Sequence, residues 1–258
     1  MRAKPLAIKG VLSDTRRLYR SLFGRSFLTG FIVFAAIGIL DTAVPHVHGW
    51  ALTALGTVAT IAAFVGTTFV QGALVPAVDS EHRGTAVPEI RELYRGSWVR
   101  LGSLVALSIL TGVGVGLGFL AFIVPGVLLA IRWALAAPVV MLEGLGARAA
   151  MKRSRELVRG HRWAVLCVLL NVWLRIGIAW LFLTKLLQQL ALFPGGELLM
   201  YWLAAALASA LVTPYAGHAL SVVYYRLTDP DRPVIAEERD RWSSIWREHD
   251  ASGDSTTA

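Results

Sequence analysis

The apolar and polar positions of the 258-residue chain alternate on a long scale, with extended apolar runs separated by shorter polar segments. A transmembrane helix needs about 20 mostly apolar residues, because it rises ~1.5 Å per residue across a hydrocarbon core about 30 Å thick. Six runs meet or nearly meet this length. We therefore predict six transmembrane helices, at residues 27–45, 53–75, 101–123, 126–142, 164–184 and 199–225.

A short arginine-bearing phrase recurs before each odd-numbered span. The copies at residues 91–96 and 155–160 differ only where Tyr94 is replaced by Val158, and the first copy aligns with them around Tyr19. Apolar residues fall at helical spacing in the first two copies, with arginines on the other face. We expect three amphipathic helices at the membrane surface, with their apolar faces toward the acyl chains. Their arginines are Arg17, Arg20, Arg91, Arg95, Arg155 and Arg159.

The predicted fold is an all-α polytopic membrane protein built from three units, each an interfacial helix followed by a two-helix hairpin. Residues 1–26 form the first interfacial helix, residues 27–225 the membrane domain and residues 226–258 a tail. Within the tail, Glu237–Asp250 is predicted to be a short amphipathic element, and the final residues to be disordered.

Two smaller features refine this picture. Alternate glycines from Gly112 to Gly118 contain overlapping Gly-x-x-x-Gly spacings, which predict close contact between the third and fourth spans. Tyr224 and Tyr225 lie near the end of the last span, and we interpret them as anchors at the membrane interface.

Composition agrees with a membrane protein, and the charge distribution predicts its orientation. The chain is 55% hydrophobic and 16% charged, whereas soluble domains carry about 25% charged residues. Lysines and arginines number seven in residues 1–26, four in 76–100, six in 143–163 and five after Tyr225, so 22 of the 25 share one face, against Lys185 alone on the other. The positive-inside rule then places both termini in the cytoplasm.

The net charge of +8 and the pI near 10.1 would suggest a nucleic-acid partner in a soluble protein. Here the excess charge is accounted for by topology and by anionic lipid. We therefore expect the lipid bilayer and its anionic lipids as partners, together with a membrane or cytoplasmic protein, and no nucleic acid.

The stretches 122–133, 137–144 and 149–160 carry a family pattern. They read Phe-Ile-Val-Pro-Gly-Val-Leu-Leu-Ala-Ile-Arg-Trp, Ala-Pro-Val-Val-Met-Leu-Glu-Gly and Ala-Ala-Met-Lys-Arg-Ser-Arg-Glu-Leu-Val-Arg-Gly. The pattern resembles the membrane-domain family of bacterial glycerophosphoryl diester phosphodiesterases and related uncharacterised six-span membrane proteins. The resemblance implies a multi-pass protein of the bacterial plasma (inner) membrane. In some members this module is fused to a cytoplasmic phosphodiesterase barrel.

One phrase, His82-Arg83-Gly84, matches the opening motif of such a barrel. A barrel needs roughly 250 residues, and the segment that holds this phrase has about 25. We therefore interpret the phrase as part of an ordinary solvated loop.

Ionisable residues inside spans are costly and mark candidate sites. Asp41 in the first span and Arg132 in the fourth each lie roughly 21 Å from the inner face. Three interpretations remain open for Arg132: an ion pair with Asp41, contact with outer headgroups or backbone carbonyls, and substrate binding.

A second group joins the fifth and sixth spans. Arg175 shares a helix face with Asn171, and Tyr215 and His218 reach similar depths on the sixth span. We predict that the four line one polar seam. Three roles remain open for it: an interhelical contact, an anion or lipid site, and a proton relay through His218.

Catalytic and cofactor motifs are missing from the sequence. It contains no Walker loop, serine elbow or histidine- and cysteine-rich metal motif, and we expect its single cysteine, Cys167, to be a small apolar core residue. We therefore expect no cofactor, no metal and no enzymatic activity. The leading hypothesis is a membrane module or accessory scaffold that contacts anionic lipids or a partner through its basic cytoplasmic face. The alternative is a transporter or permease subunit for an anionic or amphipathic substrate.

A topology reporter fused after Gly49 tests the six-span scheme. We expect a non-cytoplasmic signal, because Gly49 lies in the first connection on the face almost free of basic residues. A fusion within residues 143–163 serves as the cytoplasmic control. A cytoplasmic signal after Gly49 would overturn the scheme.

Overall fold

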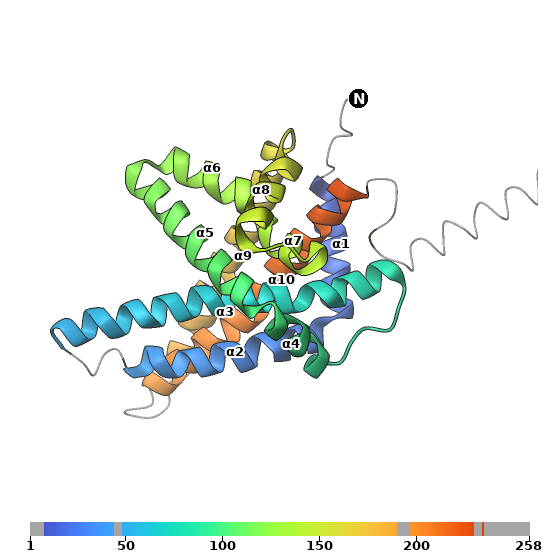
Figure 1. Cartoon of the computed structure of the whole chain (residues 1–258). Helices are drawn as coiled ribbons and strands as arrows, with labels where there is room; N and C mark the ends of the chain where they lie inside the picture. Colours follow the sequence, from blue (N-terminus) through green and yellow to red (C-terminus); the bar gives the residue numbers. More distant parts are fainter. Residues whose placement is uncertain (1–7, 44–47, 190–196, 230–233, 235–258) are drawn as a thin grey trace, which may run out of the picture.

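The structure is a computed structural model that describes residues 8–43, 48–189, 197–229 and 234, and within these ranges it contains helices and no strand (Figure 1). The predicted all-α class is confirmed for this part of the chain. The helices are α1 (Ile8–Ser21), α2 (Phe23–Ala43), α3 (Trp50–Arg83), α4 (Ile90–Val99), α5 (Leu101–Ala121), α6 (Ile123–Trp133), α7 (Ala136–Glu143), α8 (Ala147–Val158), α9 (Arg162–Gln189) and α10 (Glu197–Thr228).

Helix lengths agree with most of the predicted spans. Within the described ranges, five stretches are long and apolar enough to cross a membrane, and a sixth is reached if α1 and α2, bent by 80°, count as one span. The predicted fourth span is α6 and α7 together, from Ile123 to Glu143. The second is longer than predicted, because α3 continues past residue 75 to Arg83. The six-span topology and the side on which the termini lie stay predictions.

Helix α10 lies at the centre of the bundle, in contact with α1, α2, α3 and α9 (Figure 1). In its apolar stretch 72% of the residues are buried, compared with 18% in α9 and 22% in α5. Two glycines permit the close contacts of α10. A Cβ added to Gly30 of α2 would lie 3.0 Å from the Cα of Ala210, and one added to Gly217 would lie 3.2 Å from the Cα of Gln71. The low burial of α5 and α9 shows that these two are the outer helices.

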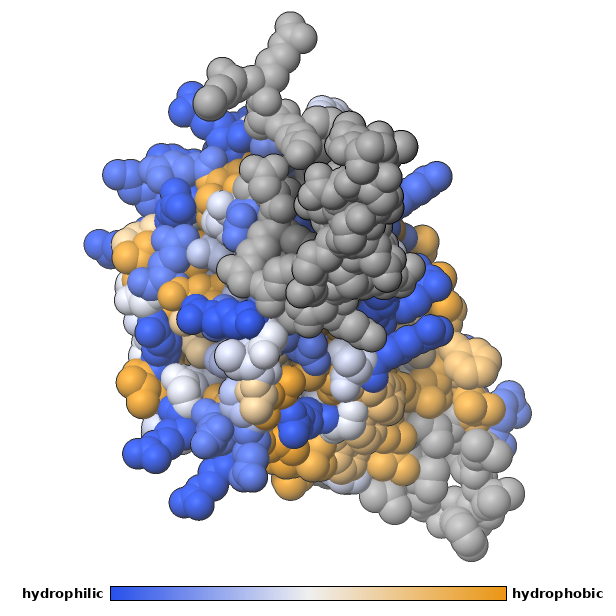
Figure 2. Space-filling view, turned by 90° about the vertical axis from the view of Figure 1, so that its right-hand side faces the viewer, coloured by the Kyte–Doolittle hydropathy of each residue, from blue (hydrophilic) through white to orange (hydrophobic). Residues whose placement is uncertain are grey.

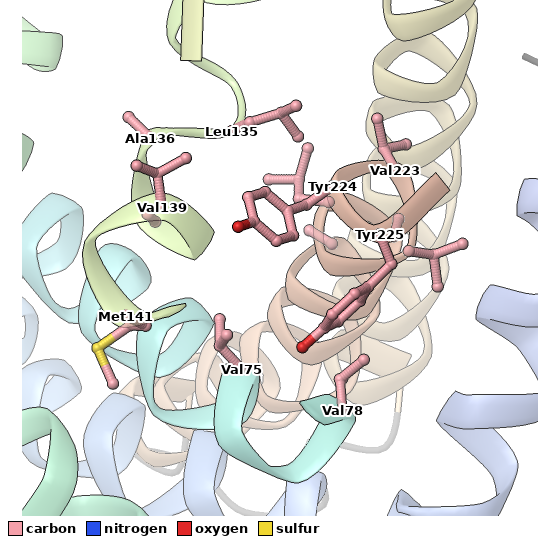
Figure 3. Packing of buried hydrophobic residues seen from close by; sticks show 14 of the residues in the cluster. Val75, Val78, Leu135, Ala136, Val139, Met141, Val223, Tyr224 and Tyr225 are labelled. Carbon is pink, nitrogen blue, oxygen red and sulfur yellow. The ribbon is translucent and has the colours of Figure 1, made fainter. Parts of the chain in front are cut away.

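The apolar core is concentrated where α3, α7 and α10 meet (Figure 3). Val75 and Val78 of α3 lie opposite Val139 of α7, and all three are at most 1% exposed. Tyr224 and Tyr225 project from α10 into this cluster. The aromatic rings of these two residues thus belong to the protein interior.

Glycines close the hairpin formed by α5 and α6, as the sequence predicts. A Cβ added to Gly118 would lie 2.8 Å from the Cα of Gly126, and one added to Gly114 would lie 2.5 Å from the ring of Trp133. Between them, Gly116 has no neighbour within 4 Å. One Gly-x-x-x-Gly pair therefore makes the contact between the two helices.

The fourth predicted span is broken, because Ala134 and Leu135 form a turn between α6 and α7. Such a break leaves backbone groups without helical partners, which is costly in an apolar environment. Ser154 of α8 is fully buried beside the break. Its hydroxyl donates to the carbonyl oxygen of Arg132 at 2.9 Å and accepts from the N–H of Leu135 at 3.1 Å. One serine thereby fixes the facing ends of two helices.

The prediction for Cys167 is wrong, since its side chain is exposed on α9. The apolar character of this helix does not distinguish an inward face from an outward one, because most of α9 lies at the periphery. In a membrane-spanning helix, the outward face is as apolar as the core.

Replacement of Ser154 by alanine tests its role at the break. We expect Ser154→Ala to destabilise the protein by about 1–3 kcal/mol, because two buried backbone groups lose their partner. The matched control is Ser221→Ala, since Ser221 is equally buried but donates only to Gly217 of its own helix. Thermal unfolding in detergent should show the larger loss for Ser154→Ala, and equal losses would contradict this role.

Candidate functional site

The three repeat helices and the last turn of α10 form one end of the bundle, which we term the basic end (α1, α4, α8 and residues 224–229). Figure 2 shows this side of the molecule, where hydrophilic side chains cover much of the coloured surface. The six repeat arginines are all exposed: Arg17, Arg20, Arg91, Arg95, Arg155 and Arg159. Three short helices thus present the predicted basic surface.

Part of the apolar face of each of these helices packs against the bundle, which corrects the expectation that the whole face lies toward acyl chains; on α4, Trp98 stays 69% exposed. Val11 and Leu18 of α1, Leu93 of α4, and Ala150 and Val158 of α8 are at most 1% exposed. Helical spacing correctly predicted an amphipathic helix in the first two copies, and the repeat correctly predicted the third. It did not predict what each apolar face would contact, since lipid and protein interior are both apolar.

The repeat tyrosines fix two of the helices onto spans. Tyr94 of α4 donates to the carbonyl oxygen of Thr29 in α2 at 2.8 Å, and Tyr19 of α1 donates to that of Leu211 in α10 at 2.7 Å. Burial raises the pKa of Tyr94 to about 12, so its hydroxyl remains a donor at neutral pH. In the third copy Val158 replaces the tyrosine, and Ser154 attaches α8 to the bundle instead.

The last turn of α10 joins three other helices through their carboxylates. Tyr224 donates to Oε1 of Glu143, at the end of α7, at 3.0 Å. Tyr225 donates to Oδ1 of Asp79, in α3, at 2.6 Å. The Tyr224 and Tyr225 side chains extend in different directions from α10 (Figure 3). Neither tyrosine is the interface anchor that its position near a span end suggested.

The next residue of α10 continues the pattern. The Nε of Arg226 lies 3.2 Å from Oδ2 of Asp14, a carboxylate of α1 that is 3% exposed. Gly10 allows this approach, because a Cβ there would lie 2.9 Å from the guanidinium of Arg226. We term the contacts of Tyr224, Tyr225 and Arg226 with Glu143, Asp79 and Asp14 the carboxylate hub.

The barrel-like phrase at residues 82–84 belongs to this region. His82 is 5% exposed in the last turn of α3, and its ring lies 4.2 Å from that of Tyr225. Its Nδ1 lies 3.1 Å from the carbonyl oxygen of Val234. The expectation of a solvated loop is therefore wrong for His82, which packs between α10 and the segment that follows it.

The carboxylate hub also affects the charge of the surface. Glu143 and Asp79 each bind an arginine as well, Arg153 at 3.2 Å and Arg83 at 2.9 Å. Each of the three hub carboxylates thus has a tyrosine or arginine partner within the protein. The repeat arginines remain exposed around them, so the outward field of this surface is positive.

The structure brings together three members of the predicted seam and separates the fourth. The Nε of Arg175 donates to Oδ1 of Asn171 at 2.8 Å, and its guanidinium lies 5.7 Å from the ring centroid of Tyr215. Arg175 is exposed on the outer helix α9. His218 is fully buried behind Tyr19.

The buried His218 has its own partner. Its Nε2 lies 2.9 Å from the hydroxyl of Ser26, and its Nδ1 has no hydrogen-bond partner among the described residues. The histidine and the arginine are therefore two neighbouring polar groups rather than one continuous lining.

Arg132 lies at the end of α6 and is partly buried. Its Nε has no hydrogen-bond partner within the described ranges, and its carbonyl oxygen accepts from Ser154. The side chain of Asp41 lies outside the described residues, as does the amphipathic element predicted at Glu237–Asp250. The ion pair between Asp41 and Arg132 stays a prediction.

Comparison with protein families decides the relationship suggested by the sequence. The family described as the membrane domain of glycerophosphoryl diester phosphodiesterase matches residues 105–234, which make up half of the chain. The chain belongs to this family. The resemblance seen in the sequence is confirmed, and together with the apolar helices it identifies an integral membrane protein. No curated protein and no solved structure matches the chain.

The part matched to this membrane-domain family runs from α5 through α10 to Val234. It contains α8, the broken fourth span and the α10 side of the carboxylate hub. The hub was missed in the sequence, because its carboxylates are distributed over residues 14–143. The adjacent pair Tyr224 and Tyr225 was the available signal, and it was assigned to the membrane interface.

A double-mutant cycle tests the contact between Arg226 and Asp14. We expect Arg226→Gln to cost about 2 kcal/mol, because it leaves a buried carboxylate without its ionic partner. Adding Asp14→Asn should recover part of this loss. The control is Arg83→Gln, where an exposed i,i+4 pair is broken at a cost of about 0.5 kcal/mol or less. Unfolding measurements that give equal losses for the two single variants would contradict the hub.

Proposed function

We propose that this protein is a non-enzymatic, multi-pass module of the bacterial plasma membrane that holds its basic end against anionic lipids at the cytoplasmic face. The observation that carries the proposal is the exposure of six repeat arginines on three helices that are each attached to the bundle. Under this proposal both termini are cytoplasmic.

Rigid attachment favours binding to a charged surface. A basic residue near an anionic membrane contributes about 1 kcal/mol, so six of them act together even though each is weak. Because α1, α4 and α8 are held by buried contacts, little ordering is needed when the arginines meet phosphates. The same surface also fits an acidic membrane or cytoplasmic protein partner, which would be held there as on a scaffold.

A transporter or permease subunit for an anionic or amphipathic substrate is the second candidate. The exposure of Arg175 on α9 favours it, because this residue lies about 20 Å along the helix from Arg162 and carries charge into an apolar surface. Its partners Asn171 and Tyr215 leave guanidinium donors for an anion. The burial of His218 argues against a proton relay that shares this surface.

The lipid proposal is tested by thermal unfolding in nanodiscs of phosphatidylcholine, with and without phosphatidylglycerol. We expect the anionic lipid to raise the Tm of the wild-type protein, because a ligand that binds the folded state stabilises it. Replacement of all six repeat arginines by glutamine should abolish most of this shift. Replacement of the same six by lysine should preserve most of it, since the charge is kept.

A second control is Arg175→Gln, which should keep the full lipid-dependent shift because Arg175 lies on α9, outside the repeat helices. A six-glutamine variant stabilised as strongly as the wild type would overturn the proposal. Loss of the shift in Arg175→Gln alone would move the anion site to the seam and favour the second candidate.

A further inference from the structure

The surface of α4 contains a shallow hollow of about 320 Å³, lined by Arg91, Tyr94, Arg95 and Trp98. These residues recur at helical spacing, so they occupy one face of the helix. No acidic residue of the described chain lines the hollow, although Glu89 and Glu92 lie nearby in the sequence. It is therefore bounded by two cations and two aromatic rings.

The floor of the hollow is held in place from several directions. The hydroxyl of Tyr94 binds the Thr29 carbonyl oxygen, and its ring lies 5.7 Å from that of Phe69. On the approach to α4, the guanidinium of Arg25 donates to the carbonyl oxygen of Val87 at 3.1 Å. The floor of the hollow, formed by Tyr94, is thus preorganised before any ligand binds.

The two arginines are available for an anion. Arg91 and Arg95 are exposed and lie one turn apart. Neither has a hydrogen bond or ion pair to another residue in the described part of the chain. Guanidinium groups at this spacing are suited to two oxygens of one phosphate, with charge-assisted hydrogen bonds.

The other end of the hollow is apolar. Trp98 is 69% exposed and Val99 is 82% exposed, and the long apolar helix α5 begins immediately afterwards at Leu101. A free phosphate ion would leave this apolar surface unused. A molecule with a phosphate at one end and hydrocarbon at the other would contact both parts.

The third repeat helix lacks this arrangement, because Val158 stands in place of Tyr94 and is 1% exposed, and Arg162 stands in place of Trp98. The first copy keeps the residue types, but the chain bends by 80° between α1 and Phe23, the counterpart of Trp98. Only in α4, of the three repeat helices as described, do the four residues follow one another along a continuous helix.

We propose that the α4 hollow binds one anionic phospholipid molecule, with Arg91 and Arg95 on its phosphate and Trp98 against its glycerol and upper acyl chain. The inference rests on the proposed function, which places the basic end at an anionic membrane surface. It adds a discrete site with a stoichiometry of one lipid per chain to that diffuse attraction.

Native mass spectrometry of the full chain, released from phosphatidylcholine nanodiscs with increasing phosphatidylglycerol, tests the site. We expect one phosphatidylglycerol to be retained at the lowest concentrations. In the double variant Arg91→Gln/Arg95→Gln, the half-saturating concentration should rise at least about tenfold, because hydrogen bonds to a charged group are lost. The matched control, Arg155→Gln/Arg159→Gln, removes the same charge from α8 and should change it by less than about threefold.

A tryptophan pair tests the apolar wall. Trp98→Ala should weaken retention about threefold, because the ring contact is lost. Trp163→Ala is the control, since Trp163 is 80% exposed near the start of α9 but does not line the hollow. Added inorganic phosphate should leave the retained lipid in place, and displacement by phosphate would overturn the assignment to a lipid.

The outcomes also separate this site from the proposed function. Equal losses in the two double-arginine variants, with no effect of Trp98→Ala, would overturn the discrete site and leave the diffuse basic surface standing. If the wild type and every variant retained phosphatidylglycerol no better than phosphatidylcholine, the site and the proposed function would both be wrong.

Discussion

The arrangement of the basic end depends on one turn of α10, in which three consecutive side chains bind carboxylates of three other helices. Successive residues of a helix point about 100° apart, so Tyr224, Tyr225 and Arg226 reach in three directions from one short segment. A buried carboxylate such as Asp14 is costly unless it is paired and hydrogen-bonded, and the partly buried Asp79 and Glu143 also have partners. The positions of α1, α3 and α7 are therefore set together, and Glu143 extends the connection to α8 through Arg153.

Attachment to the bundle explains how three short helices can present the basic surface. A helix of 10 to 14 residues is marginal by itself in water, and α1, α4 and α8 fall in that range. Each is held by a buried apolar face and by a side-chain contact to the backbone of another helix. Arg91 and Arg95 make no hydrogen bond or ion pair with another residue in the described part of the chain, so they are available for external anions.

Much of the fold could be predicted from the sequence because length and periodicity decide it. The apolar runs predicted the long helices, and the arginine-bearing repeat predicted the helices α1, α4 and α8. Gly114 and Gly118 were correctly expected to close a hairpin. In each case the property that makes the structure is visible within one segment.

What could not be predicted are contacts between segments. The outward position of Cys167 depends on which helices surround α9, and the inward position of Tyr224 and Tyr225 depends on acids far away in the chain. The depth estimated along the spans correctly predicted that Arg175 lies near Tyr215. Depth alone does not predict the direction in which a side chain points around its helix. His218 is at a comparable level and, like Tyr215, contacts the ring of Tyr19, but it is fully buried whereas Arg175 is exposed.

The contact between His82 and Val234 has a consequence for whatever follows α10. The carbonyl oxygen of Val234 is only an acceptor, so Nδ1 of His82 must carry the proton in this contact. The same ring lies 4.2 Å from that of Tyr225, tilted by 30°, and the Tyr225 hydroxyl donates to Asp79. Val234, which comes after α10 in the chain, is thus linked to the last turn of α3, and a displacement of its backbone would act first on the His82 ring and then, through Tyr225, on the packing of the central helix.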